Sequence, residues 1–230
     1  MKLAIATVFF LGCAGQPPDD LPSVDAATAD SAAGADAAIE IDAPTTNFSF
    51  FVTSTSGPTG GDFRANAADT DGLAGADAFC AAKAAAGVPA SAGKLWRAYL
   101  STTTPLVNAR ERIGAGPWFN KNGVMVASDV TNLHDPAVNI TGVTAVDETG
   151  ATVPANQHDI VTGTLATGMA APNNCNNWTS SAATGVTAAV GHHDHNAQQA
   201  WNLAHDSQGC SAAAFVATGG RGSIYCFAAN

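Results

Sequence analysis

The chain has 230 residues, of which 46% are apolar, 12% charged and 7% aromatic, enough for one sizeable hydrophobic core. Nine Lys and Arg stand against nineteen Asp and Glu, which gives a net charge of -10. Because nucleic-acid affinity comes mainly from cationic side chains on phosphates, this charge argues against a nucleic-acid partner. The longest apolar run, Leu3 to Leu11, is far shorter than the roughly 18 residues of a membrane-spanning helix, so an integral membrane protein is excluded.

The N-terminus has the features of an export signal. Met1 and Lys2 give a positively charged start, an apolar stretch follows, and Gly12 and Cys13 come directly after it. The sequence around Cys13 resembles the bacterial lipobox, which implies that residues 1–12 are a lipoprotein signal peptide and that acylated Cys13 anchors the chain to the lipid bilayer. An ordinary signal peptide with an incidental Cys is the alternative. Ala14 in place of Asp favours an outer-membrane or cell-surface location.

Residues 13–46 are predicted to be a disordered acidic tether. Residues 14–46 contain seven acidic side chains, no Lys or Arg, many Ala and four Pro. Such a composition cannot bury a hydrophobic core. The folded domain is therefore predicted to span residues 47–230.

Within this domain the residue patterns predict one main helix, several short strands and long loops. The helix is expected over 71–86 with Asp71 as its N-cap, and a hairpin is expected at Asn122-Gly123 within 117–127. Trp96, Ala98 and Leu100 alternate with Arg97 and Tyr99, as in a half-buried strand. Strands are expected over 47–54, 95–101, 174–180 and 213–227, loops with brief strands over 130–167, and a short helix or irregular loop over 196–203.

Four cysteines remain once Cys13 is assigned to lipid: Cys80, Cys175, Cys210 and Cys226. An even number in an exported chain predicts two disulfides, for which three pairings are open. No two of these cysteines have the close spacing typical of a zinc site, so zinc binding through thiols is disfavoured.

Four ordered motifs carry a resemblance to known domains. They are GADAFC at 75–80, LWRAYLS at 95–101, CNNW at 175–178 and IYCF at 224–227. This order resembles that of the endostatin domains of collagen and, more closely, that of a family of bacterial surface lipoproteins with a domain of unknown function. The resemblance implies an α+β, C-type-lectin-like fold with a mixed, mostly antiparallel sheet, one main helix, long loops and two nested disulfides. It pairs Cys80 with Cys226 and Cys175 with Cys210.

Departures from these relatives limit the functions that the resemblance implies. The domain has only five Arg, and its twelve acidic residues outnumber its eight basic ones. It therefore lacks the arginine-rich surface through which endostatin binds heparin. The Pro-containing calcium motifs of sugar-binding C-type lectins are also missing, and Trp201-Asn202-Leu203 lacks the final carboxylate. Heparin binding and calcium-dependent sugar binding are therefore not predicted.

Two groups of side chains are candidates for ligand binding. His192, His193 and His195, which flank Asp194, form a metal-like cluster that could hold zinc. Trp118 and Trp201 are the tryptophans expected at the surface as ligand contacts, whereas Trp96 and Trp178 are expected in core strands.

Catalysis is not predicted. The pairs His134-Asp135, His158-Asp159 and His205-Asp206 suggest catalytic dyads. Sequence neighbours rarely make that bond, and no nucleophile motif accompanies them. No catalytic residue is therefore assigned.

We expect a lipid-anchored, exported binding or adhesion module that recognises a protein or glycan ligand through loops at 128–172 and 182–208. Two alternatives stay open. One is a metal-dependent hydrolase centred on the His192–His195 loop, and the other is a structural envelope lipoprotein.

Overall fold

The computed structural model describes residues 47–195 and 200–230. All described residues belong to one compact unit, which spans 42–230. The predicted signal peptide, Cys13 and the tether through residue 46 lie outside the described residues, and so do residues 196–199 of the segment expected as a short helix or loop.

A mixed six-stranded sheet organises the domain around its central strand, β10 (Gly220–Ala228). Strands β1 and β2 pair antiparallel with the C-terminal half of β10, and β7 pairs parallel with its N-terminal half. Strands β8 and β9 extend the sheet beyond β7, both antiparallel. The bounds are β1 (Phe50–Val52), β2 (Trp96–Ala98), β7 (Asp159–Val161), β8 (Ala189–His192) and β9 (His205–Asp206).

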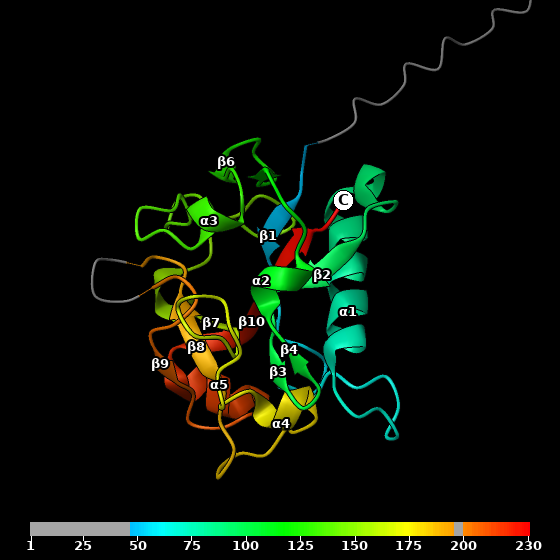
Figure 1. Cartoon of the computed structure of the whole chain (residues 1–230). Coiled ribbons are helices and arrows are strands. Elements are labelled where there is room, and N and C mark those ends of the chain that lie inside the picture. The colour runs from blue at the N-terminus through cyan, green and yellow to red at the C-terminus, as the bar shows by residue number, and fades with distance from the viewer. Residues whose placement is uncertain (1–46, 196–199) are drawn as a thin grey trace, which may run out of the picture. The chain divides into compact units, whose positions relative to one another are not determined.

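Helices and two small hairpins surround this sheet. Figure 1 shows α1 along one side of the molecule next to β2, and β7, β8 and β9 together on the other side. The helices are α1 (Leu73–Gly87), α2 (Ala109–Arg112), α3 (Val130–Leu133), α4 (Cys175–Trp178) and α5 (Ala212–Thr218), with 3-10 turns at Pro89–Ser91 and Ala155–Gln157. The hairpins pair β3 (Thr102–Thr103) with β4 (Leu106–Val107), and β5 (Trp118–Phe119) with β6 (Met125–Ala127). The predicted α+β class with a mixed sheet and few helices is confirmed.

The helices of the described residues are short or only moderately apolar. Within 47–195 and 200–230, none is both long enough and apolar enough to cross a bilayer.

Successive side chains of the central strands alternate between two hydrophobic cores. Phe51 and Cys226 face the core that contains α1, whereas Phe50, Tyr225 and Phe227 face the second core. The alternation buries both faces of β1 and of the C-terminal half of β10, which explains why β1 and the residues 224–228 of β10 are apolar.

Two disulfides join the elements around the first core. Cys80 of α1 is bonded to Cys226 of β10 across 146 residues, and Cys175 is bonded to Cys210 across 35 residues. The nested pairing implied by the resemblance is therefore confirmed.

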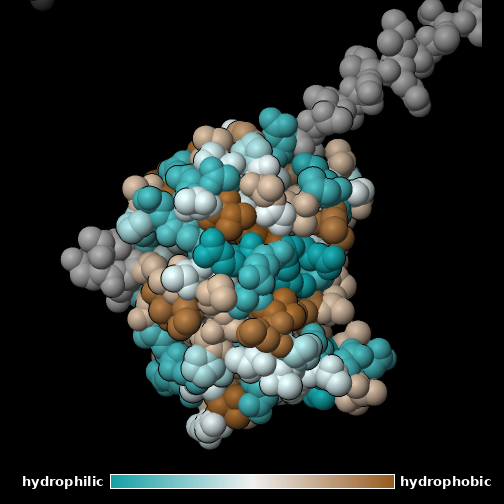
Figure 2. Space-filling view, viewed as in Figure 1, coloured by the Kyte–Doolittle hydropathy of each residue, from teal (hydrophilic) through white to brown (hydrophobic). Residues whose placement is uncertain are grey.

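Asp77 of α1 ties three elements together through its buried carboxylate. Oδ2 accepts from Arg97 of β2 at 2.6 Å and from Arg112 of α2 at 2.7 Å, and Oδ1 accepts from the backbone N–H of Ala98 at 2.9 Å. A band of hydrophilic side chains crosses the molecule over β2 and α2, with apolar patches on either side of it (Figure 2). Asp77, with its contacts to Arg97, Ala98 and Arg112, is called the Asp77 hub; it joins the main helix to β2 and α2.

Local details differ from the sequence prediction. The N-cap of α1 is Gly72, although Asp71 still accepts a hydrogen bond from the N–H of Leu73 at 2.9 Å. The expected half-buried strand predicts an exposed Tyr99, which is wrong, because the second core covers the face of the sheet opposite Ala98 and Leu100.

The strand expected over 174–180 is also wrong. Residues Cys175 to Trp178 form a left-handed turn with φ between 52° and 63°. Asn176 and Asn177 occupy its middle, and Asn tolerates this conformation better than most residues do. The strand expected from 213 starts only at Gly220, because Ala212–Thr218 is a helix whose first turn is capped by the Ser211 hydroxyl.

Candidate functional site

The two tryptophans expected at the surface are buried in the second core. Trp118 is 1% exposed and Trp201 is 2% exposed. The indole N–H of Trp118 donates to the carbonyl of Ala228, and that of Trp201 donates to the carbonyl of Leu133. The expectation of surface tryptophans is therefore wrong, because a backbone acceptor inside the fold satisfies each indole and lets the ring bury.

The segments expected as long recognition loops contain half of the central sheet. Strand β7 lies within 128–172, and β8 and β9 lie within 182–208. These strands are only two to four residues long, which is too short for a clear alternation of polar and apolar residues.

Of the three histidines predicted to bind metal, only His192 takes part in a cluster of convergent side chains. The described residues form two such groups, Asp159 with His192 and His205, and His158 with His192 and Asp194. His193 and His195 belong to neither group. His193 is 1% exposed, and burial lowers its pKa. Among the described residues, His192 thus converges with Asp159 and His205 from two other strands, and not with His193 and His195.

Strand register explains why Asp159, His192 and His205 meet. Asp159 of β7 is paired directly with His192 of β8, so their side chains lie on the same face of the sheet. His205 of β9 is paired with Val190, two residues before His192 and therefore also on that face. Neighbouring strands at the edge of one sheet thus present three ligand-type side chains side by side.

The three ligand atoms form a small triangle. His192 Nε2 lies 3.0 Å from Asp159 Oδ1, and His205 Nε2 lies 3.5 Å from the same oxygen. The two Nε2 atoms are 3.1 Å apart. The imidazole rings of His192 and His205 are steeply inclined, at 76°, with their centroids 5.1 Å apart.

The carboxylate of Asp159 is the buried centre of this triangle. Asp159 is only 2% exposed, and neither of its oxygens makes a well-formed hydrogen bond. Burial raises the pKa of the Asp159 carboxyl, while the surrounding imidazoles act in the opposite direction. A buried carboxylate without hydrogen-bond donors is costly unless a cation compensates it.

These distances match the dimensions of a tetrahedral metal site. With Zn–N and Zn–O bonds of about 2.0 to 2.1 Å, ligand atoms lie roughly 3.3 Å apart, and the centroids of two bound imidazoles lie about 5 Å apart. Two imidazoles and one carboxylate suit zinc and other first-row divalent ions. Asp159, His192 and His205 could therefore hold such an ion and leave a fourth position for another ligand.

The His-Asp neighbours were not expected to pair with each other, and two of the three pairs behave in that way. His205 Nε2 faces the Asp159 carboxylate, and its Nδ1 contacts the backbone carbonyl of Asp206 rather than the Asp206 carboxylate. His158 does lie near its own neighbour, at 3.3 Å from Asp159. His134 lies elsewhere and contacts Tyr99. The dipeptides did mark two of the residues that meet at the site, but strand pairing, which the sequence does not show directly, decides which partners meet.

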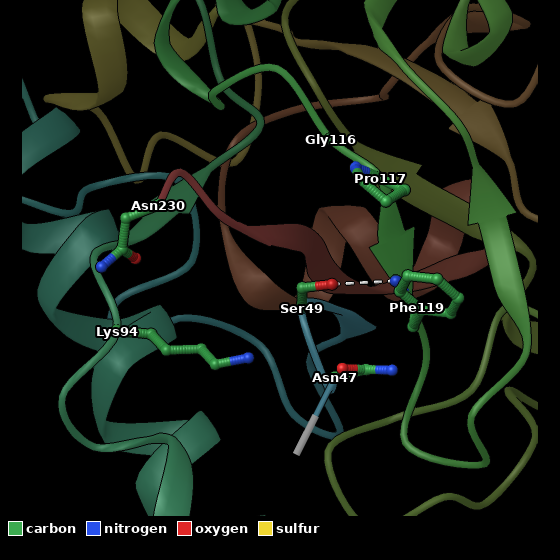
Figure 3. Close-up of a pocket in the computed structure, with 7 residues that line it drawn as sticks. All are labelled: Asn47, Ser49, Lys94, Gly116, Pro117, Phe119 and Asn230. Carbon is green, nitrogen blue, oxygen red and sulfur yellow. Dashed lines mark hydrogen bonds between the residues drawn. The ribbon is translucent and has the colours of Figure 1, made fainter. Parts of the chain in front are cut away.

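A second feature is a groove of about 380 Å³ where the first described residues meet the end of the chain. Figure 3 shows the hydrogen bond that crosses this groove, in which the backbone N–H of Phe119 donates to Ser49 Oγ at 2.8 Å. Lys94 is the one charged side chain among its seven lining residues, and its Nζ donates to the carbonyl of Phe48 at 2.7 Å. Burial lowers the pKa of Lys94. The groove therefore offers no cluster of ligand-type side chains comparable to the triangle.

Comparisons with known proteins give no family assignment. No protein-family model matches this sequence, and a search of curated proteins finds no match either.

Proposed function

We propose that this chain is an exported, lipid-anchored protein of the cell envelope whose domain binds a divalent transition-metal ion, zinc above all, through Asp159, His192 and His205. The observation that carries the metal site is the triangle of ligand atoms around a buried carboxylate that lacks hydrogen bonds. Zinc would supply the positive charge that Asp159 otherwise lacks, and the two imidazoles would bind it as neutral ligands.

The proposal of export agrees with the cysteine chemistry. Both disulfides bury their sulfur atoms and connect distant segments, a pattern of chains that fold in oxidising compartments. Their link from the main helix to the last strand also supports a C-type-lectin-like fold similar to that of endostatin, which we propose as the finer description of the domain. The anchor at Cys13 is proposed from the lipobox resemblance alone.

Recognition of a protein or glycan is a second candidate function. Large apolar side chains are exposed in the 128–172 segment at Val143, Leu165 and Met169. They offer contact area to a partner, although the buried Trp118 and Trp201 do not. The metal site is the better supported function, because its atoms already have the required spacing.

Isothermal titration calorimetry of the disulfide-bonded full chain with zinc chloride tests the metal site. We expect binding of one zinc ion per chain, with the heat lost in His205→Ala, which removes a half-exposed ligand without opening the core. His195→Ala is the matched control, because His195 lies in the sequence cluster but outside the triangle. Zinc binding that survives His205→Ala and disappears in His195→Ala would contradict this assignment. If the same protein preparation hydrolyses an ester and a chelator abolishes this activity, the domain is also a metal-dependent hydrolase.

A further inference from the structure

One more histidine stands next to the triangle and differs from its members. His158 Nε2 lies 3.3 Å from Asp159 Oδ1, and its Nδ1 lies 3.6 Å from Asp194 Oδ1. The side chains of His158 and Asp194 are 36% and 37% exposed, in contrast to the buried Asp159. His158 therefore stands between the buried carboxylate and solvent.

The ring geometry of His158 suits a neighbour of the metal better than a ligand. Its ring lies nearly parallel to that of His192, at 17°, with centroids 4.3 Å apart. Two imidazoles on one tetrahedral ion would have centroids about 5 Å apart, as His192 and His205 do. His158 thus stacks against His192, while the Asp194 carboxylate lies on its other side, 3.6 Å from Nδ1 and beyond hydrogen-bond distance, so the ring keeps its N–H free for another acceptor.

We propose that the metal keeps its fourth position for an exchangeable small carboxylate or oxyanion, and that His158 is the hydrogen-bond donor to this ligand. The proposal rests on the metal site proposed above. A divalent ion with one carboxylate and two neutral imidazoles retains a net positive charge, which attracts an anion. The exposed side chains of His158, Asp194 and His205 place the open position at the surface, where such a ligand can enter and leave.

The position of His158 also limits the kind of ligand. An anion that binds the metal through one oxygen presents a second oxygen to an imidazole N–H about one hydrogen-bond length away. Acetate and inorganic phosphate have this pair of oxygens, whereas chloride does not. Asp194 acts as a positioning residue, because it contacts His158 and not the ligand.

Cobalt substitution makes the open position visible. The disulfide-bonded full chain is loaded with Co²⁺, which accepts the same ligands as zinc and reports its coordination through visible absorption. Titration with acetate or phosphate is expected to change the spectrum saturably, and chloride is expected to bind more weakly than acetate.

Single substitutions show whether His158 donates a hydrogen bond to the anion or binds the metal itself. In His158→Ala we expect the cobalt spectrum without anion to stay unchanged and the affinity for acetate to fall about ten-fold, the size of one charge-assisted hydrogen bond. Asp194→Asn should weaken acetate binding by a smaller factor, and His195→Ala should leave it unaltered.

Different results would overturn the open position and the metal site. A spectrum that does not respond to acetate or phosphate, or a His158→Ala spectrum that differs before any anion is added, overturns the open position, because His158 would then close the coordination sphere. A wild-type chain without cobalt bands and without zinc heat overturns the metal site itself.

Discussion

At the scale of single residues, His134 shows how a partly buried polar side chain is accommodated against the second core, where it contacts Tyr99 and Trp201. Its Nδ1 lies 2.7 Å from the carbonyl of Val130, so Nδ1 carries the proton and donates. Its Nε2 is then left to accept from the hydroxyl of Tyr99, also at 2.7 Å. The Tyr99 oxygen in turn accepts from Asn202 at 3.0 Å. This chain of hydrogen bonds requires a neutral imidazole.

Acid should therefore weaken the fold through His134. Burial, and to a smaller extent the charge of Arg110, lower the pKa of His134 below its ordinary value. A lowered pKa means that the unfolded chain binds this proton more readily, so the contribution to stability is complete above about pH 6.5 and is lost as the pH falls through the folded-state value. The melting temperature should fall between pH 7 and pH 5, and it should fall less in His134→Gln, which keeps an acceptor for the Tyr99 hydroxyl.

The matched control is His195→Gln, which should leave the pH profile as it is in the wild type. An identical decline in wild type and His134→Gln would show that His134 does not carry this dependence.

At the scale of elements, the Asp77 hub is the main polar link between α1 and the rest of the domain. The side chain of Arg112 is 12% exposed and that of Asp77 10%, so this pair is largely removed from water. Arg97, at 35%, is more open. Asp77→Asn would leave Arg112 without its countercharge, and breaking such a pair should lower the free energy of unfolding by about 3 kcal/mol.

Urea denaturation of the disulfide-bonded protein measures this loss. Asp62→Asn is the control, because Asp62 pairs with Arg64 at a more exposed place, with side chains 21% and 28% exposed. That change should cost less than about 1 kcal/mol. Equal losses of unfolding free energy in the two variants would contradict the assignment of Asp77 as a buried link that stabilises the fold more than a surface ion pair does.

The same scale shows what sequence patterns can and cannot predict. The helix over 71–86 and the hairpin at Asn122-Gly123 were predictable, because helix formers and turn residues act locally. The turn at Cys175–Trp178 was not, since four residues with positive φ are held by hydrogen bonds and a disulfide from distant segments. The disulfide pairing came from the resemblance and not from spacing.

The proposed metal site was predictable only in part for the same physical reason. His192 stood out because histidines cluster around it, but Asp159 and His205 are 33 residues before it and 13 after it. Only the register of β7, β8 and β9 brings them together. Burial of Trp118 and Trp201 likewise depends on the second core as a whole.

At the scale of the whole molecule, the proposed metal site should lower the stability of the domain when no metal is bound. Asp159 is buried without hydrogen bonds, in the sheet that also includes β10, so we expect its charge to destabilise the metal-free fold. Asp159→Asn removes the buried charge while keeping the shape of the side chain. Without metal, this variant should melt at the same temperature as the wild type or higher.

With zinc bound, the wild type should melt at a higher temperature than Asp159→Asn. At a zinc concentration one hundred times the dissociation constant, binding stabilises the wild type by about 2.7 kcal/mol, which corresponds to a rise in Tm of roughly 5 to 10 °C for a domain of this size. Asp159→Asn lacks a ligand and should gain little. Differential scanning calorimetry with zinc and with a chelator measures both curves. A metal-free Asp159→Asn protein far less stable than the wild type would instead show that the carboxylate stabilises the fold directly.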